Sequence, residues 1–232
     1  MTTAPGRLAV IATPIGNLED ITFRAVRILQ EADLIAAEDT RVTRKLLNRY
    51  EIKTPLISLY EQNERGRIPE LIGKIESGRT VAQVSDAGTP GISDPGYRLI
   101  KACLDAGVNV EVVPGPTASI TALVASGLPT DRFLFIGFPP PKTVGRRKWL
   151  EDVADERGTL VMYESPHRVK QTLADIDLVL GDRPVALARE LTKMFEETIR
   201  GTAAEILAKF GDKNVKGEIV LVVGGKTRKS NR

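Results

Sequence analysis

The chain has 232 residues, of which 42% are hydrophobic, and its formal net charge is +3. This length suffices for one large domain or two small ones, each with a real core. No stretch has the roughly 18 to 20 uncharged apolar residues that a membrane span needs. Residues 1–7 also lack the apolar core of a signal peptide. A soluble, cytoplasmic protein is therefore expected.

Cysteine and histidine are too scarce for two common kinds of chemistry. Cys103 is the only cysteine, which excludes a disulfide within the chain. His167 is the only histidine, whereas a structural zinc site needs about four Cys or His ligands and a catalytic site usually needs three protein ligands. A magnesium site made of carboxylates stays open, but no pattern calls for one, so no metal is predicted.

The first half of the chain alternates short apolar strands with amphipathic helices. We expect strands at 8–12, 34–37, 56–59, 80–84 and 110–113. Helices are expected at 20–32, capped by Asp20, at 40–50, at a segment ending near 77–78, and at 97–106. Such alternation predicts a mostly parallel sheet covered by helices. The rhythm breaks at Pro114-Gly115-Pro116, where we place a domain boundary.

The second half has longer strands, richer in β-branched and aromatic residues. After a linking helix at 117–126, strands are expected at 133–138, 159–164, 185–190, 197–200 and 219–223. Helices are expected near 147–154, 168–180 and 203–210. The sequence thus predicts a two-domain α/β protein, with a mostly parallel sheet in residues 1–116 and a mixed α/β domain in residues 117–232.

Three loops rich in glycine and proline follow strands, at 13–17, 85–96 and 114–117. Ligands of open α/β sheets bind beyond the carboxyl ends of strands. Ordinary turns would also explain the short loops, but a twelve-residue loop with three Gly, two Pro and two Asp is costly to order without a function. Asp86 and Asp94 could accept hydrogen bonds from an amine or ribose hydroxyls. No G-x-G-x-x-G follows the first strand, which disfavours a dinucleotide oxidoreductase.

Charged residues also mark strand ends and basic clusters. Glu38 and Asp39 follow the second strand, where an acid either binds a ligand or caps the next helix. Similar strand-end positions hold Tyr163, Glu164 and His167, and Arg189, Glu190 and Lys193. Basic residues gather at 41–49 and 142–148, which suits a phosphate backbone but equally a solvated helix face.

Taken together, six segments resemble one known family. They are residues 13–18, 37–41, 85–96, 114–116, 163–168 and 189–193, in the order seen in the ribosomal RNA small subunit methyltransferase I family of the tetrapyrrole methylase superfamily. The resemblance spans roughly Leu8 to Gly224. It implies a two-domain α/β fold with the cofactor in the cleft between the domains, and a homodimer. It also implies S-adenosyl-L-methionine-dependent 2′-O-methylation of a cytidine ribose in 16S ribosomal RNA of the small subunit, near the decoding centre.

Carried over by position, the resemblance also implies site residues. Cofactor contacts are expected at Pro14, Gly16, Asp86, Ala87, Gly88, Ile92, Ser93, Thr117, Tyr163 and Leu191. The catalytic candidates near the ribose hydroxyl are Glu38, Glu164, Arg189 and Lys193, with Asp39, His167 and Glu190 as further lining residues. Lys193 could accept a proton only if burial lowered its pKa. Phosphates around a flipped-out nucleotide would contact Arg41, Arg44, Arg146, Arg147 and Lys148.

Three other functions stay open from the sequence. Small-molecule tetrapyrrole methylases usually have G-x-G-P-G in the first loop, whereas this chain has Ala12-Thr13-Pro14-Ile15-Gly16, which favours the RNA-modifying branch. A tetrapyrrole-type methyltransferase is therefore the main alternative. A non-catalytic RNA-binding module would need no cofactor loop, and a protein methylase similar to diphthine synthase departs in the motifs quoted above.

Overall fold

The computed structural model describes residues 5–227, which divide into one compact unit up to Thr117 and another from Ala118. The first unit contains β1 (Arg7–Ile11), β2 (Leu34–Ala37), β3 (Leu56–Ser58), β4 (Thr80–Val84) and β5 (Asn109–Val113). They form one parallel sheet in the order β3-β2-β4-β1-β5. The expectation of a parallel sheet is confirmed.

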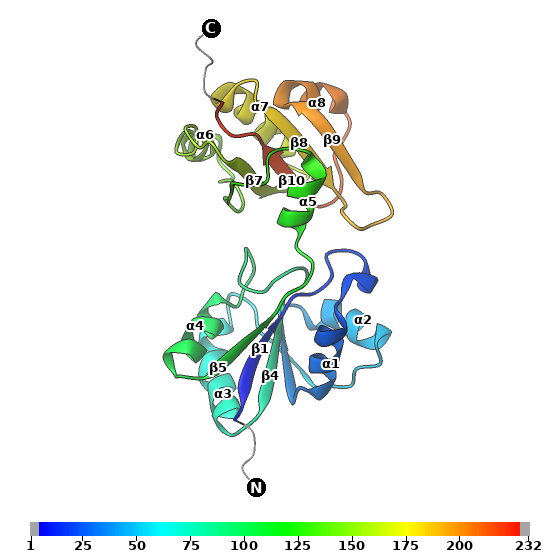
Figure 1. Ribbon diagram of the computed structural model, residues 1–232, viewed down its shortest axis with the longest axis vertical. Coiled ribbons are helices and arrows are strands. Elements are labelled where there is room, and N and C mark those ends of the chain that lie inside the picture. Colours follow the sequence, from blue (N-terminus) through cyan, green and yellow to red (C-terminus); the bar gives the residue numbers. More distant parts are fainter. Residues whose placement is uncertain (1–4, 228–232) are drawn as a thin grey trace. The chain divides into compact units, whose positions relative to one another are not determined.

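Helices cover both faces of this sheet (Figure 1). On one face, α1 (Phe23–Glu31) and α2 (Thr40–Arg49) pack a core that includes Ile11, Ile28 and Leu47. On the other, α3 (Glu64–Glu76) and α4 (Tyr97–Asp105) pack a second core. Alternate residues of β1 serve the two cores, since successive strand side chains point to opposite faces.

The first residues of α1 and α2 can be compared with the caps expected from the sequence. Asp39 caps α2, which is one of the two roles considered for it, and its carboxylate accepts the Arg41 N–H at 2.8 Å. The expected Asp20 cap of α1 is wrong, because Asp20 ends a short 3₁₀ turn, η1 (Leu18–Asp20). Thr22 caps α1 instead, with its hydroxyl accepting the Ala25 N–H at 3.1 Å. A β-region residue with a side-chain oxygen is what an N-cap requires, and both Asp and Thr supply one.

The second unit contains β6 (Phe133–Phe135), β7 (Thr159–Glu164), β8 (Pro184–Arg189), β9 (Glu197–Thr202) and β10 (Ile219–Val223). Their order is β6-β7-β10-β8-β9, with β6 parallel to β7 and the other pairs antiparallel. The predicted mixed α/β domain is confirmed. The expected strand at 133–138 is too long, because Gly137 takes a positive φ of 69° and prolines follow.

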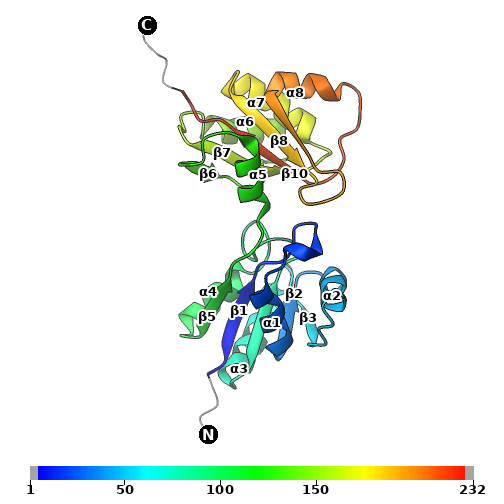
Figure 2. The ribbon, with the colours of Figure 1, turned by 45° about the vertical axis from the view of Figure 1, so that its right-hand side comes forward.

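Helices also cover both faces of the second sheet (Figure 2). The helices α6 (Thr143–Glu151), α7 (Val169–Leu180) and α8 (Ala203–Phe210) pack against Val185 and Leu187 of β8 in one core. The other face of β8 and β10 contacts α5 (Ala118–Ser126). None of the helices described in residues 5–227 is long and apolar enough to cross a membrane.

Candidate functional site

The carboxyl ends of β1 and β4 form the topological switch point of the first sheet. The chain leaves β1 for β2 through α1 on one face, and leaves β4 for β5 through α4 on the other. The two connections diverge from neighbouring strands, and such points are where open α/β sheets bind ligands. Two of the three glycine- and proline-rich loops begin here.

Hydrogen bonds tie these two loops together. Thr13 and Gly88 exchange both backbone hydrogen bonds, at 2.9 and 3.0 Å, and form an isolated β-bridge. The buried Thr13 hydroxyl donates to the Ser85 carbonyl at 3.0 Å. The predicted cofactor residues Pro14 and Gly88 are thereby held on adjoining segments of one edge.

The long loop follows a path that few side chains permit. Gly96 has a φ of +125°, and a Cβ there would lie 1.7 Å from the Gln83 Nε2 atom. Ser93 adopts a φ of +63°, which is uncommon for a residue with a side chain. Strained backbone conformations persist only where the surrounding structure holds them in place, and they are concentrated at functional sites.

Three carboxylates gather where β2 and β4 end. The Asp86 carboxylate accepts the Asp39 N–H at 3.0 Å, and the Asp86 N–H donates to the Glu38 carboxylate at 3.3 Å. Asp94 accepts a hydrogen bond from Ser85 in the same loop. Glu38, Asp86 and Asp94 form no ion pair with any Lys or Arg among residues 5–227, although the nearby charge of Arg41 acts on Asp86.

The electrostatics of these carboxylates reflect their burial first and their neighbouring charges second. Burial raises the pKa of Asp94 to about 6, and the neighbouring Glu38 charge adds to the shift. Burial also raises the pKa of Glu38 and of Asp86, against the lowering effect of one backbone hydrogen bond on each and, for Asp86, of the Arg41 charge. By contrast, its hydrogen bonds to Arg41 lower the pKa of the nearby Asp39 to about 2.

This set of hydrogen-bond acceptors fits a ligand that is cationic and rich in hydroxyl groups. Carboxylates without an ion pair attract an ammonium or sulfonium group, and their oxygens accept hydrogen bonds from ribose hydroxyls. The loop residues Ala87 and Ile92 are partly exposed beside them, with Ile92 49% exposed, and Gly16 is exposed in the adjoining loop. Within the described residues, no cluster of His, Cys, Asp and Glu could hold a metal ion.

In the second unit, Tyr163 is the penultimate residue of β7, and its ring makes edge-to-face contacts with Phe135 and Phe138, at centroid distances of 4.9 and 5.5 Å. The buried Leu191 follows β8. On either side of it, Glu190 and Thr192 take positive φ angles of 50° and 66°. A β-branched residue such as Thr192 rarely adopts this conformation, so the segment after β8 is strained.

The Glu164 carboxylate is fully engaged within the second unit. One oxygen accepts the Ser165 N–H at 2.6 Å and lies 2.9 Å from the Arg168 guanidinium, while the other accepts the Thr172 hydroxyl at 2.5 Å. Glu164 is 3% exposed. These bonds fasten the start of α7 to the end of β7, which gives Glu164 a positioning role that the sequence did not reveal.

Lys193 is held between two acids. Its ammonium lies 3.1 Å from the Glu190 carboxylate and 3.0 Å from that of Glu218. Burial alone would lower the pKa of Lys193, but the hydrogen bonds to Glu218 and Glu190 outweigh it and raise the pKa. The condition for Lys193 to accept a proton is therefore not met, and it acts as a cation. Sequence reasoning missed Glu218, whose only signal was an acid directly before an apolar strand.

The predicted RNA contacts differ in accessibility. Arg146 is 1% exposed and its guanidinium lies 2.6 Å from the Asp175 carboxylate, which contradicts its predicted contact with an RNA phosphate. The helix starts at Thr143, before the expected residue 147, so Arg146 lies within it, on the same buried face as Leu150. Arg147 also pairs with Asp175 but is 45% exposed. Arg44 and Lys148 are exposed, and their roles stay predictions, as does that of Arg41.

Comparisons with known proteins agree with this architecture. Residues 7–207 match the family model of tetrapyrrole (corrin/porphyrin) methylases. A ribosomal RNA small subunit methyltransferase I of Halalkalibacterium halodurans is 52% identical over 97% of this chain and 78% of its own length. Its namesake in Thermotoga maritima is 48% identical over 95% of this chain and 99% of its own length. A crystal structure of uroporphyrin-III C-methyltransferase from Thermus thermophilus superposes with a TM-score of 0.63, at 25% identity and 94% coverage of both chains.

The chain belongs to the tetrapyrrole methylase family, and within it to the group of ribosomal RNA small subunit methyltransferase I. The resemblance expected from the six segments is thereby confirmed.

Proposed function

We propose that this protein transfers a methyl group from S-adenosyl-L-methionine to the 2′-hydroxyl of a cytidine ribose in 16S ribosomal RNA. The observation that carries the proposal is the cluster of three carboxylates without an ion pair at the switch point, in a chain 52% identical to a ribosomal RNA methyltransferase. The cluster calls for a positively charged ligand, and family membership names a methyl donor that carries one.

The first unit would hold the donor through its two joined loops. Asp86 and Asp94 would accept hydrogen bonds from the ribose hydroxyls or the ammonium group, and Gly88 and Ser93 give backbone access. Bound S-adenosyl-L-methionine supplies a methyl group on a sulfonium, with a neutral thioether as leaving group. Positioning alone can contribute about 7 to 11 kcal/mol to such a transfer. The contacts of Pro14, Gly16, Ala87, Ile92, Thr117, Tyr163 and Leu191 stay predictions.

Among the catalytic candidates, we propose Glu38 as the group that takes the ribose proton. One of its oxygens accepts the Asp86 N–H, and no side chain described in residues 5–227 donates to the other. Its raised pKa makes it a stronger base than an ordinary glutamate. Glu164 is engaged on both oxygens, and Lys193 is a cation that could stabilise a developing oxyanion.

Purified protein, methyl-labelled S-adenosyl-L-methionine and small-subunit ribosomal RNA test the function directly. We expect label in RNA, recovered after nuclease digestion as one ribose-methylated cytidine in a mass spectrum. Label transferred to a tetrapyrrole but not to RNA would replace this proposal with the small-molecule alternative. Failure to bind S-adenosylhomocysteine in a calorimeter would instead leave a non-catalytic RNA-binding module.

The role of Glu38 has its own test. Glu38→Gln keeps an oxygen for the Asp86 N–H, so we expect kcat to fall at least tenfold while KM for the donor changes little. A raised donor KM with kcat unchanged would assign Glu38 to donor binding instead. Lys193→Met should lower kcat without shifting the pH profile, because Lys193 is not the titrating base.

A homodimer and a cytoplasmic location complete the proposal, both on the ground of the family and of an RNA substrate that is made and assembled in the cytoplasm. Light scattering on the purified chain should give twice the 25.3 kDa of one copy. A mass of one copy at micromolar concentration would reject the dimer.

A further inference from the structure

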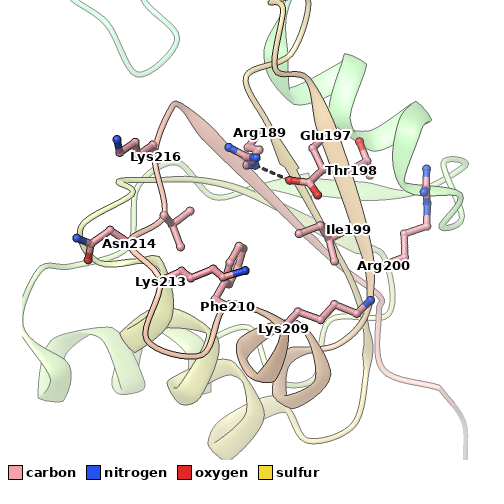
Figure 3. Close-up of a pocket in the computed structure, with 11 residues that line it drawn as sticks. Arg189, Glu197, Thr198, Ile199, Arg200, Lys209, Phe210, Lys213, Asn214 and Lys216 are labelled. Atoms are coloured by element: carbon pink, nitrogen blue, oxygen red, sulfur yellow. Dashed lines mark hydrogen bonds and ion pairs between the residues drawn. The ribbon is translucent and has the colours of Figure 1, made fainter.

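A hollow of about 570 Å³ opens on the second unit between β9, the end of α8 and the segment that follows it (Figure 3). Lysines from the α8 side and side chains of β8 and β9 surround it. Its charged side chains include Lys209, Lys213, Lys216 and Arg189, against a single lining carboxylate, Glu197. The residues that line it belong to no part of the carboxylate cluster described above.

The hollow has more positive than negative side chains. Glu197 is already bound by Arg189, with a distance of 2.6 Å between Nε and the carboxylate. None of the carboxylates in the described part of the chain forms an ion pair with Lys209, Lys213 or Lys216. One lysine would suffice to complement the negative end of α8, but Lys213 and Lys216 lie beyond the helix. The surplus positive charge therefore calls for an anionic partner.

The floor of the hollow is apolar. Ile199, Phe210 and Val215 line it and pack, partly buried, against the hydrophobic core of the second unit. Figure 3 shows the side chains of Lys209 and Lys213 reaching from the α8 side toward β9, with Lys216 at the rim. Cations above an apolar, aromatic floor suit a nucleotide better than a simple anion, because bases and riboses pack on such surfaces.

The hollow lies at the edge of the sheet that carries the candidate site of the second unit. Arg189 is the last residue of β8 and pairs in register with Glu197, the first residue of β9. The strained segment with Lys193 connects these two residues. The connection that contains Lys193 therefore begins and ends beside residues that line the hollow.

We propose that this hollow binds the phosphodiester backbone of a single-stranded stretch of the RNA substrate. Lys209 and Lys213 contact neighbouring phosphates, Lys216 a third at the rim, and a base or ribose packs on Phe210. A concave site with an aromatic floor fits splayed nucleotides, whereas a duplex offers a convex surface with its bases stacked inside. The inference rests on the proposed function, because it takes the RNA to be the methyl acceptor.

The test compares two variants that each lose three positive charges. The first carries Lys209→Gln, Lys213→Gln and Lys216→Gln, and the matched control carries Lys53→Gln, Lys74→Gln and Lys101→Gln in the first unit. RNA affinity is measured against salt concentration by fluorescence anisotropy, with circular dichroism as a check of folding. Single-stranded contacts give a slope of about 0.7 per phosphate, so the first variant should lose about 2 from the slope, and at least tenfold in affinity at low salt. The control should stay close to the wild type.

Equal slopes and affinities in the two variants would overturn the inference. The inference would also fail if inorganic phosphate binds in the hollow, as detected by competition, while the lysine substitutions leave RNA affinity unchanged. That result would identify a site for small anions. Phe210→Leu keeps the packing against the core but removes the ring, and should weaken RNA binding by about 5- to 100-fold without changing the salt slope.

The two proposals fail in distinguishable ways. If the wild-type protein methylates no ribosomal RNA, the proposed function is wrong, whatever the variants do. If the wild type methylates RNA and the hollow variant does so with unchanged KM for RNA, only the inference about the hollow is wrong. Affinity for S-adenosylhomocysteine should be the same in all variants and confirms that the first unit is intact.

Discussion

The two sheet edges of this protein both carry acidic side chains, but they differ in how many of these acids form ion pairs. In the first unit, Glu38, Asp86 and Asp94 have raised pKa values and no ion pair among the described residues. In the second, Lys193 binds both Glu190 and Glu218. The pKa of Glu190 is lowered, first by the Glu218 N–H and then by Lys193. A cluster of carboxylates without ion pairs is energetically unfavourable. The first edge is therefore the place where we expect a ligand to supply positive charge.

The largest expected effect breaks another internal ion pair of the second unit, between α6 and α7. Asp175→Ala would leave the buried Arg146 guanidinium without its carboxylate, which lies 2.6 Å away in the wild type. Removing one partner of a buried pair costs about 3 to 5 kcal/mol. Urea denaturation should show the loss in the free energy of unfolding, with donor binding retained at low denaturant.

The control for this change is Arg147→Ala. Arg147 binds the other oxygen of Asp175 but is 45% exposed, so its loss should cost about 1 kcal/mol or less. Similar losses for the two substitutions would mean that burial does not decide the strength of these pairs.

The next effect tests the carboxylates without ion pairs. Asp86→Asn keeps an oxygen for the Asp39 N–H but removes the negative charge. Hydrogen bonds to charged groups contribute about 1.5 to 3 kcal/mol, so affinity for S-adenosyl-L-methionine should fall about 10- to 100-fold by calorimetry. Asp105→Asn, which breaks an exposed pair with Lys101, is the matched control and should leave the affinity unchanged. A change below twofold for Asp86→Asn would remove this residue from the donor site.

The spacing of hydrophobic residues, together with the glycines and prolines between them, predicted most of the fold. The strands 34–37, 80–84, 159–164 and 219–223 and the helix 203–210 agree with the structure at both ends. Hydrophobic patterns decide such elements locally, as does the glycine or proline that ends them. The misjudged start of α6 changed more than a boundary, because it left Arg146 outside the expected helix, whereas Arg146 shares the buried face of α6 with Leu150, one turn later.

Of the candidate site, the sequence predicted only which residues follow the ends of strands. The rule for open sheets placed Asp86, Asp94 and Glu38 on one edge before any coordinates. The residues that form hydrogen bonds or ion pairs with the site residues lie far away in the sequence, and no sequence pattern identifies them. The Thr13–Gly88 bridge and the Glu218–Lys193 pair each join residues that only the sheet topology brings together. For the same reason, Glu164 and Lys193 could not be told from bases by sequence alone.

A smaller effect comes from the titration of Asp94. Its pKa of about 6 lies above the ordinary 3.8, so the folded apo protein holds this proton more strongly than the unfolded chain. Its contribution to stability is therefore present at low pH and lost as pH rises from about 4 to about 6. Binding of the cationic donor has the opposite sign, because it needs the ionised form, and should weaken as pH falls below about 6. Calorimetry between about pH 5 and pH 8 should show this loss, and Asp94→Asn should flatten it. An unchanged profile in the variant would assign the titration to Glu38 or Asp86.

The smallest expected effect adds charge to the hollow of the second unit. Glu197→Gln removes the carboxylate that binds Arg189, in a pair whose Glu197 side chain is 46% exposed. Exposed pairs contribute about 0 to 1 kcal/mol, so the free energy of unfolding should barely change. The freed Arg189 guanidinium can then meet a further phosphate, which should raise RNA affinity a few-fold and steepen the salt slope by about 0.7. If RNA binding weakens instead, Glu197 contacts the RNA itself, and this edge of the second unit is not selected for positive charge.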